Sequence, residues 1–280
     1  MKPLHFWVIG GDTRQTYLAR ALAEDGHRVH TYALDRNTDM PDLEGVKRAD
    51  CVVLPLPAQR EGRLNGTPAL EWGPLLDALS PGAPILAGKV DSPLREEARR
   101  RGLTLIDYFD REELAVANAV PAAEGAIQIA MARLPITLHG AGVLIIGAGR
   151  IGKVLVQQLR GLGAHVALAA RKNADLAWGA VWGCETLRSD RLGEYRLEGY
   201  DLVLNTVPAP VLGRRELERL GAGTLVIDLA SAPGGTDFTA AQPLGIQAVQ
   251  ALGLPGKVAP KTAALALRST LYHILCELGV

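Results

Sequence analysis

The stretch Gly142-Val-Leu-Ile-Ile-Gly147-Ala-Gly149-Arg-Ile-Gly152 decides the fold class of the second half of the chain. Its apolar run predicts a short buried strand, and apolar residues continue at helical spacing after the glycines as far as Leu162. A Gly-x-Gly-x-x-Gly turn that joins a strand to a helix is the fingerprint of a dinucleotide-binding fold. The context, and not the pattern alone, therefore predicts a nucleotide site.

Each glycine of this turn meets a separate physical need. Gly147 permits the tight turn, Gly149 lets the backbone approach a pyrophosphate, and Gly152 lets the helix pack closely on the strand. The N-terminus of the helix then attracts the anion. We expect the cofactor to contact Gly147, Gly149, Arg150, Ile151 and Gly152.

The end of the next predicted strand indicates which dinucleotide binds. About 20 residues after the first strand, an NAD site normally places Asp or Glu to hold the ribose 2′-hydroxyl. This chain has Arg171 and Lys172 there. A guanidinium forms paired, charge-assisted hydrogen bonds to phosphate, and Lys172 adds a second positive charge. We predict NADP(H) rather than NAD(H); the alternative is that Arg171 is only a solvated cation.

Two further loops follow predicted strands and are expected to line the nicotinamide. Asn205-Thr206-Val207-Pro208 comes after the strand at 201–204, and Asp228-Leu229-Ala230-Ser231 comes after the strand at 224–228. Ligands of open α/β sheets bind at the carboxyl ends of the strands. The first loop supplies the expected cofactor contacts Asn205, Thr206, Val207 and Pro208; a turn that Asn and Pro merely shape is the alternative.

Short apolar strands alternate with helices in both halves of the chain. This alternation predicts an α/β fold with two doubly wound, Rossmann-like parallel sheets joined by inter-lobe helices. We expect a substrate domain at 1–120, an NADP-binding domain at 121–260, and a closing helix at 261–280 that packs on the first domain. The expected strands are 4–9, 27–33, 50–56, 84–87, 103–106, 143–146, 165–169, 201–204, 224–228 and 246–249, and the expected helices include 13–24, 68–79, 93–101, 111–118 and 121–134, the last opened by Pro121.

Composition and charge exclude several classes of protein. Thirty basic residues balance thirty acidic ones among 280, so no global field attracts nucleic acid or an anionic membrane. No apolar run approaches the ~18 residues of a membrane-spanning helix, and no secretory signal is expected. We therefore expect a cytoplasmic protein. The three cysteines lie outside any Cys-x-x-Cys pattern and are expected to be buried thiols, and no metal site is predicted.

The first strand of the chain ends in a different turn, Gly10-Gly11-Asp12-Thr13-Arg14-Gln15. It lacks the third glycine of the fingerprint, so a second dinucleotide is not expected there. Backbone N–H groups at a helix N-terminus and the guanidinium of Arg14 together suit a carboxylate. The alternative is that Asp12 caps the helix and Arg14 is solvated.

These motifs resemble those of the A-subunit family of dipicolinate synthases over almost the whole chain. The similar segments are Gly-Gly-Asp-Thr-Arg-Gln at 10–15, Leu-Pro-Leu-Pro at 54–57, Ala-Glu-Gly-Ala-Ile-Gln-Ile-Ala-Met at 123–131, the glycine turn at 147–152, Asp-Leu-Ala-Ser-Ala-Pro-Gly-Gly-Thr-Asp-Phe at 228–238, and Gly-Leu-Pro-Gly-Lys-Val-Ala-Pro-Lys-Thr-Ala at 253–263. The last two are the most specific. Ala122 departs from the family, in which a hydroxyl residue is expected before Ala-Glu-Gly.

The resemblance implies an NADP-dependent dehydrogenase of the mother cell of a sporulating bacterium. Its expected reaction converts a dihydrodipicolinate-type intermediate of the lysine pathway to pyridine-2,6-dicarboxylate. It also implies that the synthase has a second, flavoprotein-like component, its B subunit, and a homo-oligomer is left open.

Such a reaction needs a hydride acceptor, a base and cations for two carboxylates. Arg14 and Lys261 are nominated for the carboxylates, because a cation at the start of the closing helix opposes the helix dipole and so suggests a ligand role. A lysine that only reaches solvent is the alternative. Glu124 and Asp12 are the candidate bases, although Glu124 also fits a simple first-turn carboxylate. The substrate-binding candidates are Gly11, Thr13, Arg14, Ser231, Gly235, Thr236 and Lys261.

Three other functions are considered. A D-2-hydroxyacid dehydrogenase uses a late histidine, but the only one after His165 is His273, inside the predicted terminal helix. A shikimate-dehydrogenase-like enzyme remains open, because Lys89 and Asp91 follow a strand end. A non-catalytic NADP(H)-binding subunit that positions its flavoprotein partner also remains open.

Overall fold

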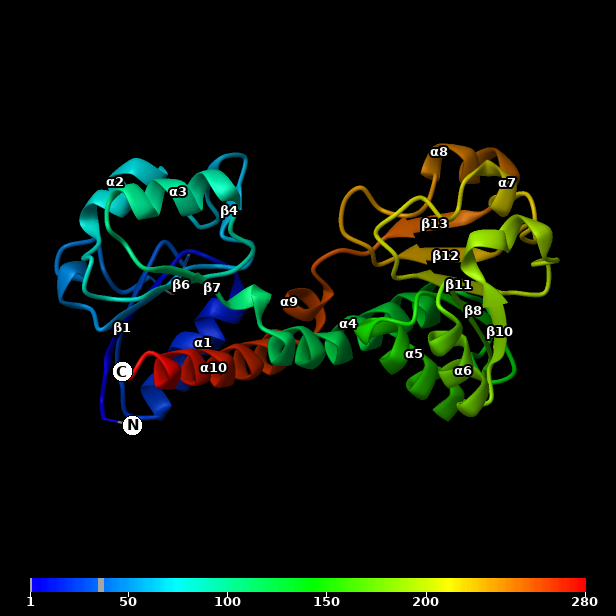
Figure 1. The fold of residues 1–280 in the computed structure, drawn as a ribbon, viewed down its shortest axis with the longest axis horizontal. Helices are drawn as coiled ribbons and strands as arrows, with labels where there is room; N and C mark the ends of the chain where they lie inside the picture. Colours follow the sequence, from blue (N-terminus) through cyan, green and yellow to red (C-terminus); the bar gives the residue numbers. More distant parts are fainter. Residues whose placement is uncertain (1, 35–37) are drawn as a thin grey trace. The chain divides into compact units, whose positions relative to one another are not determined.

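The computed structural model describes residues 2–34 and 38–280 and divides into two compact units (Figure 1). Unit 1 comprises residues 1–118 and 259–280, and unit 2 comprises residues 119–258. The bounds expected from the sequence, at 120 and 260, lie two residues from these limits. Each unit has its own parallel sheet with buried side chains on both faces.

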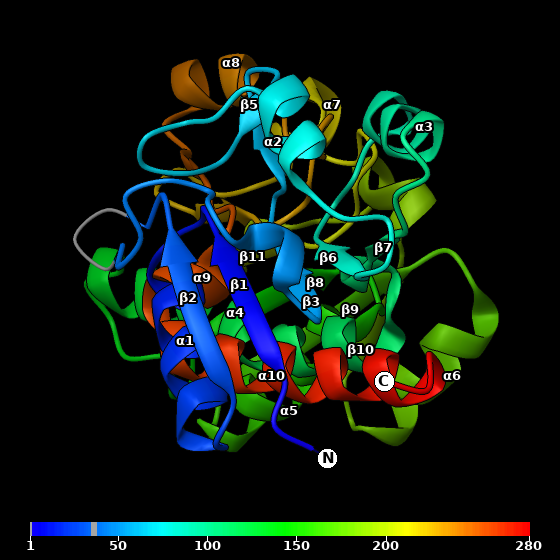
Figure 2. The same ribbon diagram turned by 90° about the vertical axis from the view of Figure 1, so that its left-hand side faces the viewer.

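Unit 1 is built on a five-stranded parallel sheet. Its strands are β1 (His5–Ile9), β2 (Arg28–Tyr32), β3 (Cys51–Val53), β6 (Ile85–Ala87) and β7 (Leu105–Asp107), in the order β2-β1-β3-β6-β7. This is the flavodoxin-like order of a doubly wound sheet, in which ligands bind at the carboxyl ends of the strands. Figure 2 shows β1 and β2 running side by side.

Helices cover both faces of this sheet. They are α1 (Thr13–Glu24), α2 (Trp72–Ala78), α3 (Ser92–Arg100) and the closing helix α10 (Pro260–Glu277), with short 3-10 turns at Val46–Arg48 and Tyr108–Asp110. The apolar face of α10 packs on α1, and Arg268 and Tyr272 of α10 bond to Asp25 at the end of α1. The closing helix thus packs on unit 1.

Unit 2 has a six-stranded parallel sheet. Its strands are β8 (Gly142–Ile146), β9 (His165–Ala170), β10 (Glu185–Arg188), β11 (Leu202–Asn205), β12 (Leu225–Asp228) and β13 (Gln247–Gln250), in the order β10-β9-β8-β11-β12-β13. This is the 3-2-1-4-5-6 order of the Rossmann fold. The helices are α5 (Arg150–Gly161), α6 (Asn173–Val181), α7 (Arg214–Leu217), α8 (Phe238–Ala241) and α9 (Leu254–Val258), with 3-10 turns at Ser189–Glu194 and Gln242–Leu244. The predicted fold class is confirmed.

One continuous helix, α4 (Glu112–Arg133), replaces the two helices expected at 111–118 and 121–134. Pro121 lies inside it rather than opening a new helix. Proline has no N–H, so the carbonyl of Ala117 loses its intrahelical bond. Burial offsets that loss: Pro121 is buried, and Ala123, Ala126 and other small apolar residues of α4 enter the core of unit 2.

The apolar character of α4 bears on membrane association. Its 22 residues are long and apolar enough for a span, and it is the one helix in the described part of the chain that passes this test. Half of the apolar window is buried within the protein. A core helix passes the same test, so its apolarity is weak evidence for a membrane.

The sequence prediction missed two strand regions and misplaced two features. β10 was not predicted, because Glu185-Thr-Leu-Arg188 is largely polar, and neither was the hairpin of β4 (Gln59–Arg60) and β5 (Arg63–Leu64). The helix expected from 68 begins at Trp72, since the preceding residues extend this hairpin through the Leu64–Leu70 bridge. Cys51 and Cys184 are buried as expected, but Cys276 is exposed near the end of α10.

A buried histidine predicts an acid-sensitive unit 1. The Nδ1 atom of His27 accepts a hydrogen bond from the backbone N–H of Leu4 at 3.1 Å, which requires an unprotonated Nδ1. Burial lowers the pKa of His27 below its ordinary value near 6.5. As the pH falls, His27 of the unfolded chain therefore binds a proton at a higher pH than His27 of the folded chain. The free energy of unfolding should decrease from pH ~6.5 downward until the lowered pKa of the folded chain is reached. His27→Asn, whose carbonyl can accept the same N–H, should reduce this decrease in denaturant titrations. The exposed His165→Asn is the control, and an equal reduction there would contradict the assignment.

Candidate functional site

The glycine turn of unit 2 is shaped by close backbone contacts. Gly147 has φ +105°, and a Cβ there would lie 2.3 Å from Thr206 Oγ1. A Cβ on Gly152 would lie 1.9 Å from the carbonyl oxygen of Gly147, so only glycine allows α5 to start this close to β8. Both glycines therefore serve the local packing that the sequence pattern predicts.

Gly149 differs from these two glycines because the space around it is open. It is the N-cap of α5 with ordinary backbone angles (φ −73°), and a Cβ there would meet nothing within 4 Å. Among the described residues, no side chain caps the helix. An open glycine at an uncapped helix N-terminus is the cradle that a pyrophosphate requires, so the residues present fit a dinucleotide.

A buried carboxylate joins the loops next to this turn. Asp228, fully buried at the end of β12, accepts hydrogen bonds from Asn205 Nδ2 and the N–H groups of Ala230 and Gly235, all at 2.9 Å. Asn205 is also fully buried, and its amide bonds both the N–H and the carbonyl of Val207. One network thus fixes the loop after β11 and the loop after β12, including its glycines at 234–235.

The remaining cofactor and substrate candidates of these loops lie at the same sheet edge. Thr206 donates its hydroxyl to the carbonyl of Ile146 at 2.9 Å, which ties the loop after β11 to the glycine turn. Pro208 and Ser231 are exposed, and Thr236 is half-buried, with a buried hydroxyl oxygen that has no partner in the described part of the chain. The structure therefore brings the candidates of the glycine turn and of the loops after β11 and β12 together around the carboxyl ends of β8, β11 and β12.

Basic side chains gather at the ends of β9 and β10. Arg171 and Lys172 directly follow β9, are exposed, and have no carboxylate partner within the described chain. Arg188 ends β10 and forms a two-point ion pair with Asp190, Nε to Oδ1 at 3.0 Å and Nη2 to Oδ2 at 2.7 Å. This guanidinium lowers the pKa of Asp190. The sequence prediction missed Arg188 because it missed β10.

The turn after β1 in unit 1 is closed by side chains. Asp12 caps α1 by accepting the N–H of Arg14, and Gln15 completes the capping box by accepting the N–H of Asp12. Gly11 has φ +109° and sits against Gln15, where a Cβ would lie 2.5 Å away. Thr13, the first residue of α1, is exposed.

Arg14 is held between Asp12 and Leu56, a residue of the loop after β3. Its Nε and Nη2 bond the Asp12 carboxylate at 2.9 and 2.7 Å, and Nη2 also donates to the carbonyl of Leu56. Only 12% of the side chain is exposed. Within the described residues, the Nη1 atom donates no hydrogen bond. Asp12 is occupied as cap and ion-pair partner, so its assignment as base stays a prediction that the geometry does not strengthen.

Two polar side chains near Arg14 are fully buried. Among the described residues, the buried Gln15 Nε2 has no hydrogen-bond partner, and the Tyr108 hydroxyl donates to the carbonyl of Leu54 at 2.9 Å. Burial raises the pKa of Tyr108, so its phenol stays protonated and acts only as a donor or acceptor. No pattern in the sequence points to this pair, because its members lie 93 positions apart (15 and 108).

Lys89 has a conformation unusual for a lysine. Its φ is +57°, and Asp107 accepts its N–H at 2.9 Å and that of Val90 at 2.7 Å. Asp107 is buried and also pairs with Arg95. Asp91 caps α3 by accepting the N–H of Leu94. Asp91 is thus occupied structurally, while the exposed Lys89 side chain is not.

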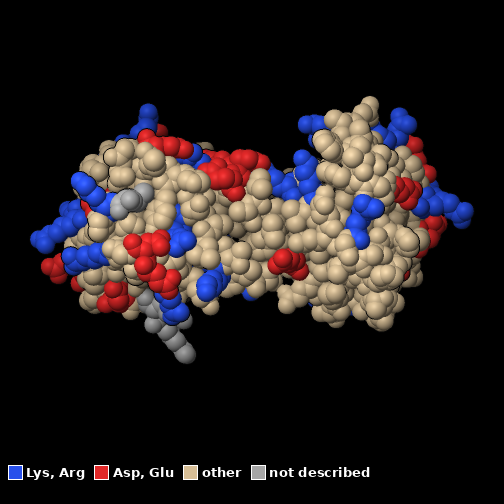
Figure 3. All heavy atoms as spheres, turned by 90° about the horizontal axis from the view of Figure 1, so that it is seen from below, with Lys and Arg blue, Asp and Glu red and all other residues tan. Residues whose placement is uncertain are grey.

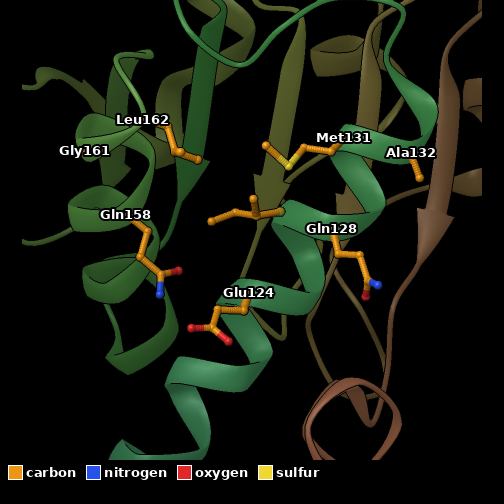
Figure 4. Close-up of a pocket in the computed structure, with 8 residues that line it drawn as sticks. Glu124, Gln128, Met131, Ala132, Gln158, Gly161 and Leu162 are labelled. Atoms are coloured by element: carbon orange, nitrogen blue, oxygen red, sulfur yellow. The ribbon is translucent and has the colours of Figure 1, made fainter.

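Glu124 lies away from the carboxyl edge of the unit 2 sheet, and Lys261 belongs to unit 1. Glu124 lines an apolar groove of about 650 Å³ between α4 and α5, opposite Gln158 (Figure 4). Gln158 is eight residues beyond the start of α5, about 12 Å along the helix from the glycine turn. Lys261 is exposed on the first turn of α10. The roles of both residues stay predictions, and the position of Glu124 does not strengthen its assignment as base.

The groove belongs to a face of unit 2 with few charges. Figure 3 looks onto the side formed by α4, α5 and α6, where most atoms of unit 2 belong to neither basic nor acidic residues. Its exposed apolar side chains include Met131, Leu162, Trp178 and Val181. Among the described residues, no group of three metal-binding side chains exists.

Comparison with known proteins relates this geometry to a family. The family model for the N-terminal domain of the dipicolinate synthase A subunit matches residues 5–109. The A subunit of dipicolinate synthase from Bacillus subtilis (strain 168) is 33% identical over 97% of this chain and 95% of its own length. The crystal structure of the same subunit from Bacillus halodurans has 31% identity and a TM-score of 0.88 over 97% of each chain. A transhydrogenase from Sinorhizobium meliloti, at 19% identity, 96% coverage of this chain and 93% of its own, and a TM-score of 0.69, shares the fold.

The Asp228 network predicts a large effect of a single-atom change. Asp228→Asn replaces one acceptor oxygen by an N–H₂ group, which then faces donors such as the N–H of Gly235. An unpaired buried donor costs about 1–3 kcal/mol, so the free energy of unfolding in urea should fall by about 2–3 kcal/mol. Asp201→Asn, at the other end of the β11 region, should cost less, because Asp201 accepts one bond, from Gly142 N–H, at a half-buried position. Equal losses would contradict a special role for Asp228.

Proposed function

Because the chain belongs to the A-subunit family of dipicolinate synthases, we propose that it is the NADP-dependent oxidoreductase subunit that oxidises a dihydrodipicolinate-type intermediate to pyridine-2,6-dicarboxylate. The observation that carries the proposal is the open Gly149 at the uncapped N-terminus of α5. It lies at the same sheet edge as the loop that Thr206 ties to the glycine turn. Dehydrogenases and transhydrogenases of this fold support the oxidoreductase class.

The residues that would hold the cofactor belong to unit 2. The N–H groups of the turn at 147–152 would bind the pyrophosphate, and Arg171 and Lys172 would bind the 2′-phosphate. Asn205, Thr206, Val207 and Pro208 would border the nicotinamide. When bound, the nicotinamide supplies a hydride acceptor. The buried Asn205–Asp228 pair would keep this border rigid, which favours correct orientation of reactants.

Unit 1 would supply the recognition of the substrate's carboxylates. The two free N–H groups on Arg14 Nη1 suit a carboxylate, and the contacts with Asp12 and Leu56 fix the direction of the guanidinium. Lys261 would provide a second cation. Loss of a hydride and a proton makes the ring aromatic, and a base must take the proton. The other proposed substrate contacts are Gly11, Thr13, Ser231, Gly235 and Thr236.

One observation favours a second candidate function. Asp12 is engaged by Arg14, and Glu124 lies in the groove between α4 and α5, so neither candidate base is free at the end of a strand. A non-catalytic NADP(H)-binding subunit needs no base.

In either case the relatives are named as one subunit of a synthase, which leads us to propose a second subunit as partner, with a flavoprotein-like chain as the candidate. The proposed setting is the mother-cell cytoplasm of a sporulating bacterium.

The open position of Gly149 allows cofactor binding to be tested without disturbing the fold. Gly149→Ala should raise the Kd for NADP at least about tenfold in calorimetry, because the methyl group occupies the path of the pyrophosphate. The melting temperature should change little, since nothing lies within 4 Å. Gly161→Ala is the matched control, being on the same helix and equally free of neighbours.

The unaltered chain should bind NADP more tightly than NAD; equal affinities would refute the NADP assignment.

Turnover by the purified chain separates the two candidate functions. With NADP⁺ and freshly generated dihydrodipicolinate, the dehydrogenase should produce the pyridine absorbance without any partner, whereas the binding subunit should need the second subunit.

Arg14→Ala should raise KM for the substrate strongly while the Kd for NADP stays near normal, because Arg14 and the glycine turn belong to different units. Unchanged KM would remove Arg14 from the substrate site.

A further inference from the structure

Strand register places a third basic residue beside the end of β9. β10 pairs with β9 in parallel, and Arg188 lies opposite Ala170, the last residue of β9. Arg171 and Lys172 follow at once. Neighbouring strands are about 4.8 Å apart, so Arg188 starts from the same carboxyl edge of the sheet, one strand from these two cations.

The guanidinium of Arg188 is held from two directions. Asp190 binds Nε and Nη2, and Asn173 Oδ1 accepts a hydrogen bond from Nη1 at 3.1 Å. Asn173 begins α6 and directly follows Lys172, so this bond draws Arg188 toward the segment that carries the other two cations. Within residues 2–34 and 38–280, three of the five guanidinium N–H groups are used, and one N–H on each of Nη1 and Nη2 remains for a ligand.

We propose that Arg188 is a third cation of the 2′-phosphate site and that it sets the preference for NADP over NAD, with Asp190 and Asn173 as its positioning residues. This inference rests on the proposed NADP dependence of the chain. A fork with two remaining N–H groups matches the paired oxygens of a phosphate, whereas the ribose hydroxyl of NAD carries no charge to attract it.

An ordinary surface ion pair explains the arrangement less well. Arg188 is 35% exposed and Asp190 45%, and pairs at such exposure contribute little to stability. Two-point geometry with an additional bond to Asn173 does, however, restrict the guanidinium to one orientation. A fixed orientation also directs the remaining N–H groups one way, as recognition of a phosphate requires, so the contacts suit a ligand site.

The test uses adenosine 2′,5′-bisphosphate and adenosine 5′-monophosphate as probes, with NADP and NAD beside them, in titration calorimetry on the full chain. Arg188→Gln should raise the Kd for the 2′,5′-bisphosphate and for NADP about tenfold, as expected for one lost charge-assisted contact. The Kd values for the monophosphate and NAD should change less than about twofold. Arg191→Gln is the matched control, because it removes an equal, exposed charge from the turn after β10.

Each outcome is decisive. An unchanged NADP affinity in Arg188→Gln, with the NADP preference of the unaltered chain intact, overturns the inference and leaves the proposed function standing. Equal losses for both variants, or equal losses for NADP and NAD, show a diffuse field rather than a contact and also overturn it. An unaltered chain that does not prefer NADP refutes the proposed cofactor, and the inference fails with it.

Discussion

The buried carboxylate of Asp228 is the constraint on which the arrangement of unit 2 depends. A charge taken out of water is costly unless hydrogen bonds replace its hydration. Three donors do so here, Asn205 from the end of β11 and the N–H groups of Ala230 and Gly235 from the loop after β12. Gly235 has no room for a Cβ, which would lie 2.2 Å from Asn205 Nδ2. The loops at this edge therefore keep one arrangement together.

The two units use the same sheet edge in chemically different ways. In unit 2 the strand-to-helix turn presents bare backbone, because Gly149 has no side chain and α5 has no side-chain cap among the described residues. In unit 1 the corresponding turn is filled by the side chains of Asp12, Arg14 and Gln15. A bare turn accommodates a bulky phosphate group, whereas a filled one offers a directed guanidinium. This difference follows from which residues the two turns contain, on sheets of otherwise similar construction.

Much of the fold follows from local sequence, and much of the site does not. Apolar strands and the Gly147–Gly152 turn are local signals, and α1 begins and ends where the sequence predicts. β10 has no apolar run, so the sequence did not predict this strand, and Arg188 at its end was not recognised as a candidate. Pro121 was predicted to begin a helix because proline favours the first helical turn. The packing that keeps α4 continuous through Pro121 involves residues distant in the sequence, so the local pattern does not reveal it. The bond between Asn205 and Asp228 depends on how two strands align, which no spacing along the chain specifies.

Lys89 shows how folding and side-chain chemistry can be decoupled at one position. A non-glycine residue with positive φ costs roughly 1 kcal/mol, and the buried Asp107 carboxylate holds the segment in that shape. Glycine would adopt the same backbone without strain and would keep the hydrogen bond of the N–H. A natural variant with glycine at position 89 would therefore keep its melting temperature. It would nevertheless lack the exposed ammonium group that Lys89 places after the end of β6.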